Sequence, residues 1–191
     1  MSAPQKTYQS ALCILIPTQF HPSIQRVRQE HDRHFQRWMP HINVIYPFLP
    51  ESAFEENLPT LSSLLNDIAP FHIRLTTLGK FTHSKSETVF LRPDTTPLRS
   101  LEALESRLVA LFPHLGEQRQ FGEYTPHLSL GQILKKGRRS KPDESWVEDT
   151  RREFSENPVE FYVDEVALIS RRGFHDPFDI RFRVALGKQN I

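Results

Sequence analysis

The stretch Pro40-His41-Ile42-Asn43-Val44 recurs, in the same order of residue types, as Pro126-His127-Leu128-Ser129-Leu130. Each copy is a proline, a histidine, an apolar residue, a small hydrogen-bonding residue and a second apolar residue. Side chains of a β-strand alternate between its two faces. In each copy the histidine and the polar residue therefore share one face, and the two apolar residues share the other. The repeat predicts two half-buried strands, each presenting an imidazole beside a polar group.

The composition makes a chance origin of this repeat rare. The chain has 9 histidines and 15 prolines among its 191 residues. At those frequencies, two such matches arise by accident in roughly one of a thousand to ten thousand sequences. The alternative interpretation is two half-buried strands whose polar faces carry a histidine without a function. The repeat favours a single site built from two half-sites.

Length and composition are those of an ordinary globular chain. The 191 residues are 38% hydrophobic and 25% charged, and a chain of this length can bury a sizeable core. We expect residues 1–191 to form a single domain of two lobes. The net charge of +1 excludes a polycation, so any binding of nucleic acid must come from local patches.

The N-terminal residues and the single cysteine predict a protein inside the cell. Residues 1–6 lack the apolar core of a signal peptide, and the apolar run at residues 11–16 is far too short to span a bilayer. Cys13 lies in that run, where a cysteine is usually a small buried hydrophobe and not a nucleophile. One cysteine allows no disulfide within the chain, which suits a reducing compartment. We expect a soluble, cytoplasmic protein that does not bind membranes, with the nucleus as the alternative location.

Periodic patterns predict strands and helices that are mixed along the chain. Apolar residues at helical spacing, or a proline in a first turn, predict helices over residues 22–38, 51–69, 98–112 and 145–154. Strands are expected over residues 10–16, 71–81, 87–92, 159–170 and 180–186, the third of them ended by Pro93. Such mixing indicates an α+β or α/β fold. The two motif histidines lie 86 residues apart (127 − 41), close to half the chain, which indicates an internal duplication that gives two similar lobes with a cleft between them.

Two facing imidazoles suit phosphodiester chemistry that needs no metal. One of His41 and His127 accepts a proton from the attacking water or hydroxyl, and the other donates a proton to the leaving oxygen. An imidazole pKa near neutrality makes both roles accessible. The charged phosphoryl oxygens need donors held in place, which the Asn43 amide and the Ser129 hydroxyl can provide.

These residues resemble the 2H phosphoesterases, which include bacterial 2′-5′ RNA ligases, cyclic-nucleotide phosphodiesterases and the enzymes that trim U6 small nuclear RNA. The hallmark of the family is two tetrapeptides of the form His-x-Thr/Ser-x, matched here by residues 41–44 and 127–130. Flanking residues 40, 45–48, 124–126 and 131–132 are similar as well, and the resemblance spans nearly the whole chain. It implies a two-lobed, pseudo-twofold-symmetric α+β fold, with antiparallel sheets flanking a central cleft and helices outside.

The resemblance implies a metal-independent phosphodiesterase that acts on RNA ends or 2′,3′-cyclic nucleotides. His41 and His127 would be the catalytic acid and base, while Asn43 and Ser129 would hold the phosphate. The expected partner is RNA or a nucleotide with a 2′,3′-cyclic phosphate or a 2′-5′ linkage, bound by a monomer without a cofactor. The first motif departs from the family because Asn43 stands where a hydroxyl is usual. RNA 2′-5′ ligation, or a catalytically weak member that binds a nucleotide or RNA, are the alternatives.

Further candidates lie outside the two motifs. Tyr124, Phe81, Tyr46 and Phe174 are candidates for stacking on a nucleic-acid base. A core role is the favoured interpretation for each, and strand alternation places Tyr46 on the apolar face. Arg171 and Arg172 lie at a turn between two strands and are candidates for gripping phosphate. A basic run near the second motif is either a solvated loop or a patch that steers an RNA backbone. It consists of Lys135, Lys136, Arg138, Arg139 and Lys141.

One pair of histidines has a spacing seen in metal sites. His31 and His34 are three residues apart in the predicted helix. No cysteine or well-placed carboxylate completes a recognisable ligand pattern around them. We therefore expect no metal site.

Overall fold

Strands dominate the computed structural model, which describes residues 6–115, 122–135 and 144–187. Within these residues, eight strands form two four-stranded sheets in which all the neighbouring strands are antiparallel. The strands are β1 (Ser10–Leu15), β2 (His41–Ile45), β3 (Phe71–Thr82), β4 (Ser86–Thr96), β5 (Leu128–Leu134), β6 (Val159–Val163), β7 (Glu165–Ser170) and β8 (Asp179–Ala185). One sheet has the order β2-β1-β7-β8 and the other β5-β4-β3-β6. The fold is therefore mixed α+β, as the sequence predicts.

The connectivity of the two sheets repeats. The longer helices are α1 (His21–His31), α2 (Phe54–Asn66), α3 (Ser100–Leu111) and α4 (Ser145–Glu156). Early in the chain β1, α1 and β2 follow one another, and later β4, α3 and β5 do the same. Both β2 and β5 are edge strands that pair with the strand preceding their helix. The two histidine motifs therefore occupy equivalent places in the two sheets.

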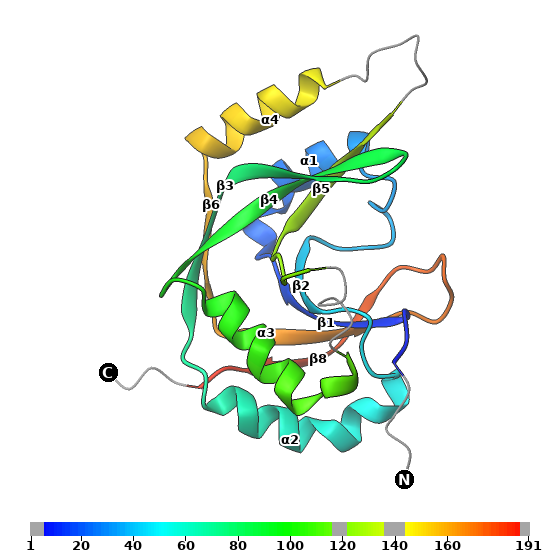
Figure 1. Cartoon of the computed structure of the whole chain (residues 1–191), viewed down its shortest axis with the longest axis vertical. Helices are drawn as coiled ribbons and strands as arrows, with labels where there is room; N and C mark the ends of the chain where they lie inside the picture. The colour runs from blue at the N-terminus through cyan, green and yellow to red at the C-terminus, as the bar shows by residue number, and fades with distance from the viewer. Residues whose placement is uncertain (1–5, 116–121, 136–143, 188–191) are drawn as a thin grey trace.

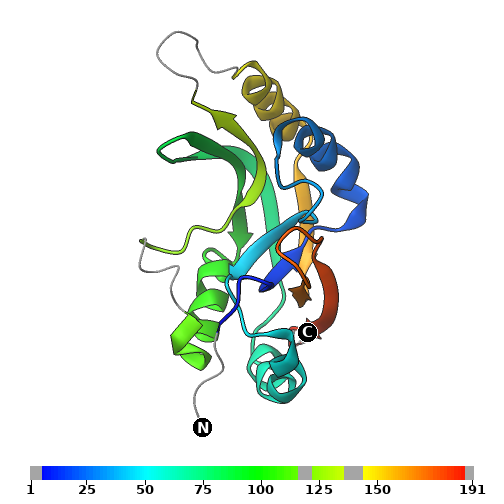
Figure 2. The same cartoon turned by 90° about the vertical axis from the view of Figure 1, so that its right-hand side faces the viewer.

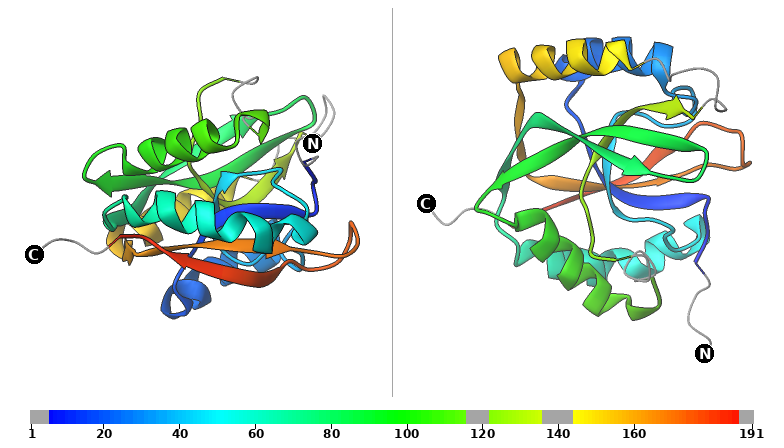
Figure 3. Two further views of the ribbon diagram at one scale, coloured as in Figure 1. Left: turned by 90° about the horizontal axis from the view of Figure 1, so that it is seen from below. Right: turned by 45° about the horizontal axis from the view of Figure 1, so that its top comes forward.

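The helices pack in two pairs at opposite ends of the strands. Helices α1 and α4 contact β5 and β3, whereas α2 and α3 contact β8 and β2. Figures 1 and 3 show α1 with α4 at one end of the molecule and α2 with α3 at the other. Helix α1 thus packs on the sheet that contains β5, and α3 packs on the sheet that contains β2. Each of these helices connects two strands of one sheet and packs on the edge strand of the other.

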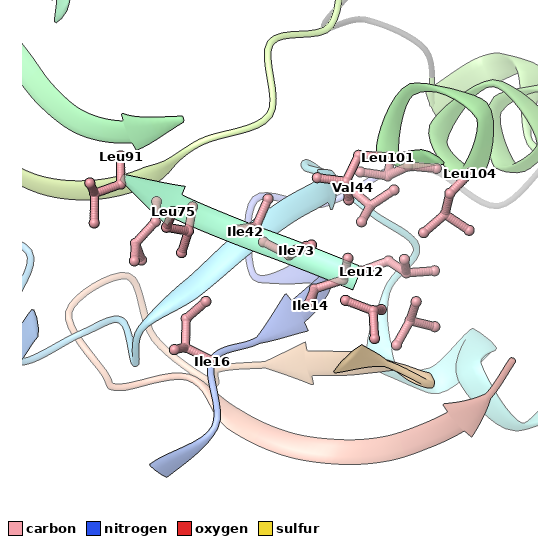
Figure 4. Close-up of a cluster of buried hydrophobic side chains, with 14 of the residues drawn as sticks. Leu12, Ile14, Ile16, Ile42, Val44, Ile73, Leu75, Leu91, Leu101 and Leu104 are labelled. Carbon is pink, nitrogen blue, oxygen red and sulfur yellow. The ribbon is translucent and has the colours of Figure 1, made fainter. Parts of the chain in front are cut away.

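The hydrophobic core lies between the two sheets, which Figure 2 shows as neighbouring layers. Leu12 and Ile42 of one sheet meet Ile73 and Leu91 of the other, and Leu104 of α3 closes the cluster (Figure 4). All five side chains are at most 1% exposed. Fully burying one such side chain stabilises a fold by about 1.5–3 kcal/mol, so this interior fixes how the two sheets face each other.

A second, smaller cluster covers the opposite face of β1. It contains Cys13 and Ala11 together with Ala167, Ile169 and Phe178. Burial raises the pKa of the Cys13 thiol far above its usual range, so the group stays protonated. Cys13 is therefore a buried hydrophobe, as expected from its apolar surroundings.

The first helix is shorter than the sequence predicts, because it ends at His31 and not near residue 38. The Asp32 Oδ1 atom accepts the backbone N–H of His34 at 2.9 Å, which is a local turn that competes with helix formation. The backbone of Asp32 is already extended. Residues 32–38 are therefore free to form a turn beside β2.

Pro93 does not end the strand in which it lies, contrary to the prediction. β4 continues from Ser86 to Thr96. Proline is tolerated in a strand at an edge or a bulge, and both conditions hold here. β5 pairs with β4 only as far as Leu91, and the pairing with β3 shifts register between Leu75 and Thr77, opposite Pro93.

The predicted single strand over residues 159–170 is in fact two strands in different sheets. β6 pairs with β3, and β7 pairs with β1 and β8. The chain changes sheets at Asp164, whose carbonyl oxygen accepts the N–H of Leu186 at 2.7 Å. Both segments alternate or run apolar, so periodicity alone shows no break. No helix within the described residues has the length and apolar character needed to cross a membrane.

Candidate active site

The two motif strands meet at a cavity of about 960 Å³ that both motif histidines line. Edge strands β2 and β5 contact each other, and they run side by side through the centre of the molecule (Figure 1). Strand alternation is as predicted: Ile42 and Leu130 are fully buried, whereas His41, Asn43 and Ser129 are half-buried and line the cavity. The structure thus brings both motifs of the sequence into one site.

The two histidines make the same backbone contact. His41 Nδ1 lies 2.7 Å from the carbonyl oxygen of Met39, and His127 Nδ1 lies 2.8 Å from that of Thr125. A carbonyl only accepts hydrogen bonds, so each neutral ring carries its proton on Nδ1. Among the described residues neither Nε2 atom has a hydrogen-bond partner. Each imidazole is therefore oriented by its own segment, with Nε2 available to accept or donate a proton.

Aromatic rings hold the two imidazoles in different ways. The Trp38 ring stacks on His41, with centroids 4.6 Å apart and planes 15° from parallel. The His127 ring instead lies nearly perpendicular to that of Phe81, with centroids 4.9 Å apart and planes at 84°, and it also contacts Phe90. Aromatic pairs of this kind stabilise a fold by more than the burial of their apolar area alone. Trp38 thus holds His41 by its face, while two phenylalanines hold His127.

Burial lowers the pKa of both histidines. The pKa of His41 falls from 6.5 to about 4, mainly because of burial and further because of the nearby positive charges of Arg28 and His127. The pKa of His127 is also lowered by burial, against the opposing effect of its bond to Thr125. Both rings are therefore neutral near pH 7 in the free protein. An anion in the cavity would offset this effect, because an opposite charge favours the protonated imidazole.

Asn43 and Tyr124 connect the two halves of the site. The Tyr124 hydroxyl donates a hydrogen bond to the backbone carbonyl oxygen of Asn43 at 2.8 Å. The Asn43 side chain has its Oδ1 atom buried without a hydrogen-bond partner among the described residues. A buried polar atom without a partner is costly, and here it lies in a side chain that lines the cavity.

A buried ion pair supports the His41 side of the cavity, and the sequence reasoning missed it. Arg28 Nε donates to Asp32 Oδ2 at 2.9 Å, and Arg28 Nη2 donates to the Trp38 carbonyl oxygen at 2.8 Å. Gln132 Nε2 donates to Asp32 Oδ1 at 3.1 Å, which ties β5 to the end of α1. The position of Gln132 directly after Gly131, in the segment that follows the second motif, was the available signal. Arg28 and Asp32 carry no motif.

The other predicted site residues divide into two groups. Phe81, Tyr124 and Tyr46 line the cavity, so Tyr46 is not simply a core residue. Arg171 and Arg172 are not among its lining residues. The buried Arg171 guanidinium lies over the rings of Phe174 and Phe178 and donates to the Tyr8 carbonyl oxygen, whereas Arg172 is exposed. The structure therefore does not bring these arginines together with the histidines.

The remaining candidates are the basic run after the second motif and the pair of histidines at metal-site spacing. Of the basic run, Lys136, Arg138, Arg139 and Lys141 lie outside the described residues, and Lys135 Nζ donates to the His83 carbonyl oxygen at 2.6 Å. His31 stacks on Trp146 with centroids 4.2 Å apart, while His34 lines the cavity. Within the described residues, no three histidine, cysteine or acidic side chains lie close enough to hold a metal ion.

Two antiparallel sheets that each bring a histidine motif from an edge strand into one cavity are the arrangement of the 2H phosphoesterases. The family model for the 2′-5′ RNA ligase superfamily matches residues 16–174. The chain belongs to this superfamily. Membership supports an enzyme of the phosphoesterase or ligase type.

Solved structures show the same fold at low sequence identity. TT0787 of Thermus thermophilus is 18% identical with a TM-score of 0.61, covering 95% of this chain and 100% of that one. LigT of E. coli in its apo form is 18% identical with a TM-score of 0.61, covering 96% and 99%. LigT in complex with 3′-AMP is 16% identical with a TM-score of 0.57, covering 95% and 99%. A comparison with curated protein sequences gave no match.

Proposed function

We propose that this protein is a metal-independent phosphodiesterase that hydrolyses phosphodiesters at RNA ends or in 2′,3′-cyclic nucleotides. The observation that carries the proposal is the matched pair of histidines. Each lines the same cavity, and each has Nδ1 held by a carbonyl two residues earlier, at 2.7 Å for His41 and 2.8 Å for His127. Two imidazoles with free Nε2 atoms are what paired acid and base catalysis needs.

The proposed step is a displacement at phosphorus. One imidazole accepts a proton at Nε2 from the attacking water, whose oxygen forms a bond to phosphorus. The other imidazole, protonated by then at both nitrogens, donates its Nε2 proton to the leaving O2′ or O3′ as the bond from that oxygen to phosphorus breaks. The product is a phosphate monoester. Because the negative substrate raises the pKa of a nearby imidazole, binding itself favours the one protonated and one neutral ring that the step requires.

Asn43 and Ser129 are proposed to hold the phosphate. Both line the cavity on the same strand faces as the histidines. The Asn43 side-chain amide and the Ser129 hydroxyl can each donate a hydrogen bond to a phosphoryl oxygen, and such donors stabilise the charge that develops in the transition state. Asn43 can donate in this way but cannot relay a proton as a hydroxyl can.

Phe81 and Tyr124 are proposed to contact the base of the substrate, since both rings line the cavity and stacking on an aromatic ring tolerates any base. One chain contributes both histidines, so a monomer of a single domain is sufficient. RNA 2′-5′ ligation is the second candidate, favoured by the match to the 2′-5′ RNA ligase superfamily. In ligation a 5′-hydroxyl takes the place of the attacking water at a 2′,3′-cyclic phosphate. One imidazole accepts the hydroxyl proton as its oxygen bonds to phosphorus, and the other donates a proton to the leaving O3′, which gives a 2′-5′ linkage.

The test is hydrolysis of a 2′,3′-cyclic mononucleotide and of an RNA ending in a cyclic phosphate, with excess chelator. We expect turnover that survives the chelator and falls by at least about a thousandfold in His41→Ala and in His127→Ala. His114→Ala, which changes an exposed histidine away from the cavity, is the matched control and should retain activity. Turnover that disappears with the chelator, or that persists in both motif variants, would overturn the proposal. Joining of RNA ends without hydrolysis would favour the ligase.

A further inference from the structure

Three basic side chains cluster in the turn after α1, on the His41 side of the cavity. Arg33 and His34 line the cavity, and Arg37 contacts His34 from behind. The Arg33 Nε–H group points at His34 Nε2 at 3.1 Å, and Arg37 Nη2 lies against His34 Nδ1. Both ring nitrogens of one imidazole therefore face guanidinium donors.

This arrangement cannot satisfy its own hydrogen bonds. A neutral imidazole has one nitrogen that accepts and one that donates, and a protonated imidazole has none that accepts. His34 can therefore accept from Arg33 or from Arg37 but not from both. One of the two contacts places donor against donor, and the three groups are left with more donors than acceptors.

No carboxylate in the described part of the chain pairs with Arg33 or Arg37. Asp32 is the acidic neighbour, but its oxygens are already engaged. Oδ2 accepts from Arg28 at 2.9 Å, and Oδ1 accepts from the backbone of His34 at 2.9 Å and from Gln132 at 3.1 Å. Burial and the charges of Arg37, Arg33 and Arg28 lower the pKa of His34, against the opposing charge of Asp32. The described part of the chain therefore offers no unengaged carboxylate that could accept hydrogen bonds from this cluster.

Charge around the cavity is also asymmetric. Both arginines that line it, Arg28 and Arg33, lie on the His41 side. Beside His127 the lining includes Thr82, His83, Thr88 and Glu123, with no arginine or lysine among the described residues. A ligand with a second negative group would therefore be oriented, with that group toward His41.

We propose that Arg33, His34 and Arg37 form a second phosphate site, which holds a phosphate of the substrate other than the one that reacts. This rests on the proposed function, and it narrows the substrate to nucleotides or RNA ends that carry a further phosphate beside the scissile one. An anion in the cavity accepts donors from Arg33 and allows His34 to protonate and donate to it as well, while Arg37 adds positive charge on the other side of the His34 ring. Arginine is suited to this because its planar donors match phosphate oxygens.

The kinetic test compares two substrates that differ by one phosphate. These are a 2′,3′-cyclic mononucleotide with a 5′-hydroxyl and the same nucleotide with a 5′-phosphate; a dinucleotide ending in a cyclic phosphate distinguishes a bridging diester from a terminal monoester. We expect the extra phosphate to raise kcat/KM about tenfold or more, mainly through KM, as fits charge-assisted hydrogen bonds. Arg33→Gln should reduce that preference to near one, and Arg33→Lys should restore part of it. Arg92→Gln, which removes an exposed arginine of β4 outside the cavity, is the control.

The second site would be overturned if wild type and Arg33→Gln prefer the extra phosphate equally. It would also be overturned if wild type prefers neither the monoester nor the diester over the substrate without that phosphate. A binding test separates this failure from failure of the proposed function. Inorganic phosphate is titrated into the full chain carrying His41→Ala and His127→Ala, and the His34 ring is followed by NMR, assigned by its loss in His34→Gln. We expect phosphate to raise the pKa of His34 by about one pH unit, and adding Arg33→Gln to remove that rise. A rise in the His34 pKa with no hydrolysis of any substrate would reject the phosphodiesterase and keep the anion site. Hydrolysis with no rise in that pKa and no preference for the extra phosphate would reject the anion site and keep the phosphodiesterase.

Discussion

The Tyr124 hydroxyl donates a hydrogen bond to the backbone carbonyl oxygen of Asn43, 2.8 Å away and 81 positions earlier in the chain. This bond joins the segment before the second histidine to the middle of the strand that carries the first. The two half-sites are therefore held to each other by a direct contact as well as by the core beneath them. The distance between the two imidazoles depends on this junction.

Replacing Tyr124 with phenylalanine tests the junction. The ring remains, so any stacking on a base is kept, but the Asn43 carbonyl oxygen loses its donor. We expect a loss of about 1 kcal/mol in the free energy of unfolding and a several-fold fall in kcat/KM, measured by urea denaturation and cyclic-nucleotide hydrolysis. Tyr8→Phe, at a residue that is 57% exposed, should change neither. Unchanged stability and activity in Tyr124→Phe would show that the bond does not hold the halves together.

Trp38 is expected to keep His41 in place through its stacked ring. In Trp38→Leu the imidazole gains freedom and solvent, so the pKa of His41 should rise from about 4 toward its ordinary value near 6.5, and kcat should fall about tenfold. NMR titration of the His41 ring and steady-state kinetics provide the two measurements. Trp146→Leu is the matched control, because Trp146 stacks on His31 outside the cavity. A pKa of His41 that stays near 4 in Trp38→Leu would contradict the role given to the stacked ring.

Breaking the buried ion pair should destabilise the protein strongly. Asp32→Asn leaves the Arg28 guanidinium, which is 2% exposed, without its counter-charge. We expect a cost of about 3–5 kcal/mol in the free energy of unfolding, whereas Asp67→Asn, at the exposed pair with Arg107, should cost under about 1 kcal/mol. Urea denaturation at pH 7 compares the two. The double variant Arg28→Met with Asp32→Leu should recover much of the loss. If it does not, the cost belongs to the hydrogen bonds that Asp32 accepts from residues 34 and 132.

The lowered pKa of His41 predicts that stability falls with acidity. Since the unfolded chain takes up a proton near pH 6.5 and the folded chain only near pH 4, the unfolded state binds more protons between these values. The contribution of His41 is fully present above pH 6.5 and is lost as the pH falls toward 4. Between pH 7 and pH 4.5, the free energy of unfolding should fall by about 1–3 kcal/mol less in His41→Gln than in wild type. Urea denaturation at the two pH values measures this difference. Parallel losses in the two proteins would contradict the lowered pKa.

Local patterns were enough to predict the motif strands and their cavity-facing sides. The period of two in residues 40–44 and 126–130 assigns each side chain to a face, and the structure confirms that assignment. Helical periodicity likewise located α2, α3 and α4 to within a few residues. These features depend on neighbours in the sequence, which is why they could be predicted.

What could not be predicted depends on contacts between distant segments. The end of α1 is set by the Asp32 turn, and Asp32 is held by Gln132, 100 positions later. The change of sheets at Asp164 follows from which strands lie beside it, and its sequence resembles a continuous strand. Arg171 is a candidate for phosphate in the sequence, but its guanidinium lies over Phe174 and Phe178 and donates to the carbonyl oxygen of Tyr8, 163 positions earlier. In each case the partner lies in a segment whose position only the complete fold defines.

The exchange of covering helices has a consequence for how the molecule assembles. Helix α1 packs on β5, and α3 packs on β2, so each half of the chain completes the other. We therefore expect that neither half folds alone and that two fragments divided between the histidine motifs regain structure only when mixed. A chain of half this length, with a single motif, would find its missing helix only in a second copy of itself. The repeated order of strand, helix and strand is thus arranged so that its two helices are exchanged between the sheets.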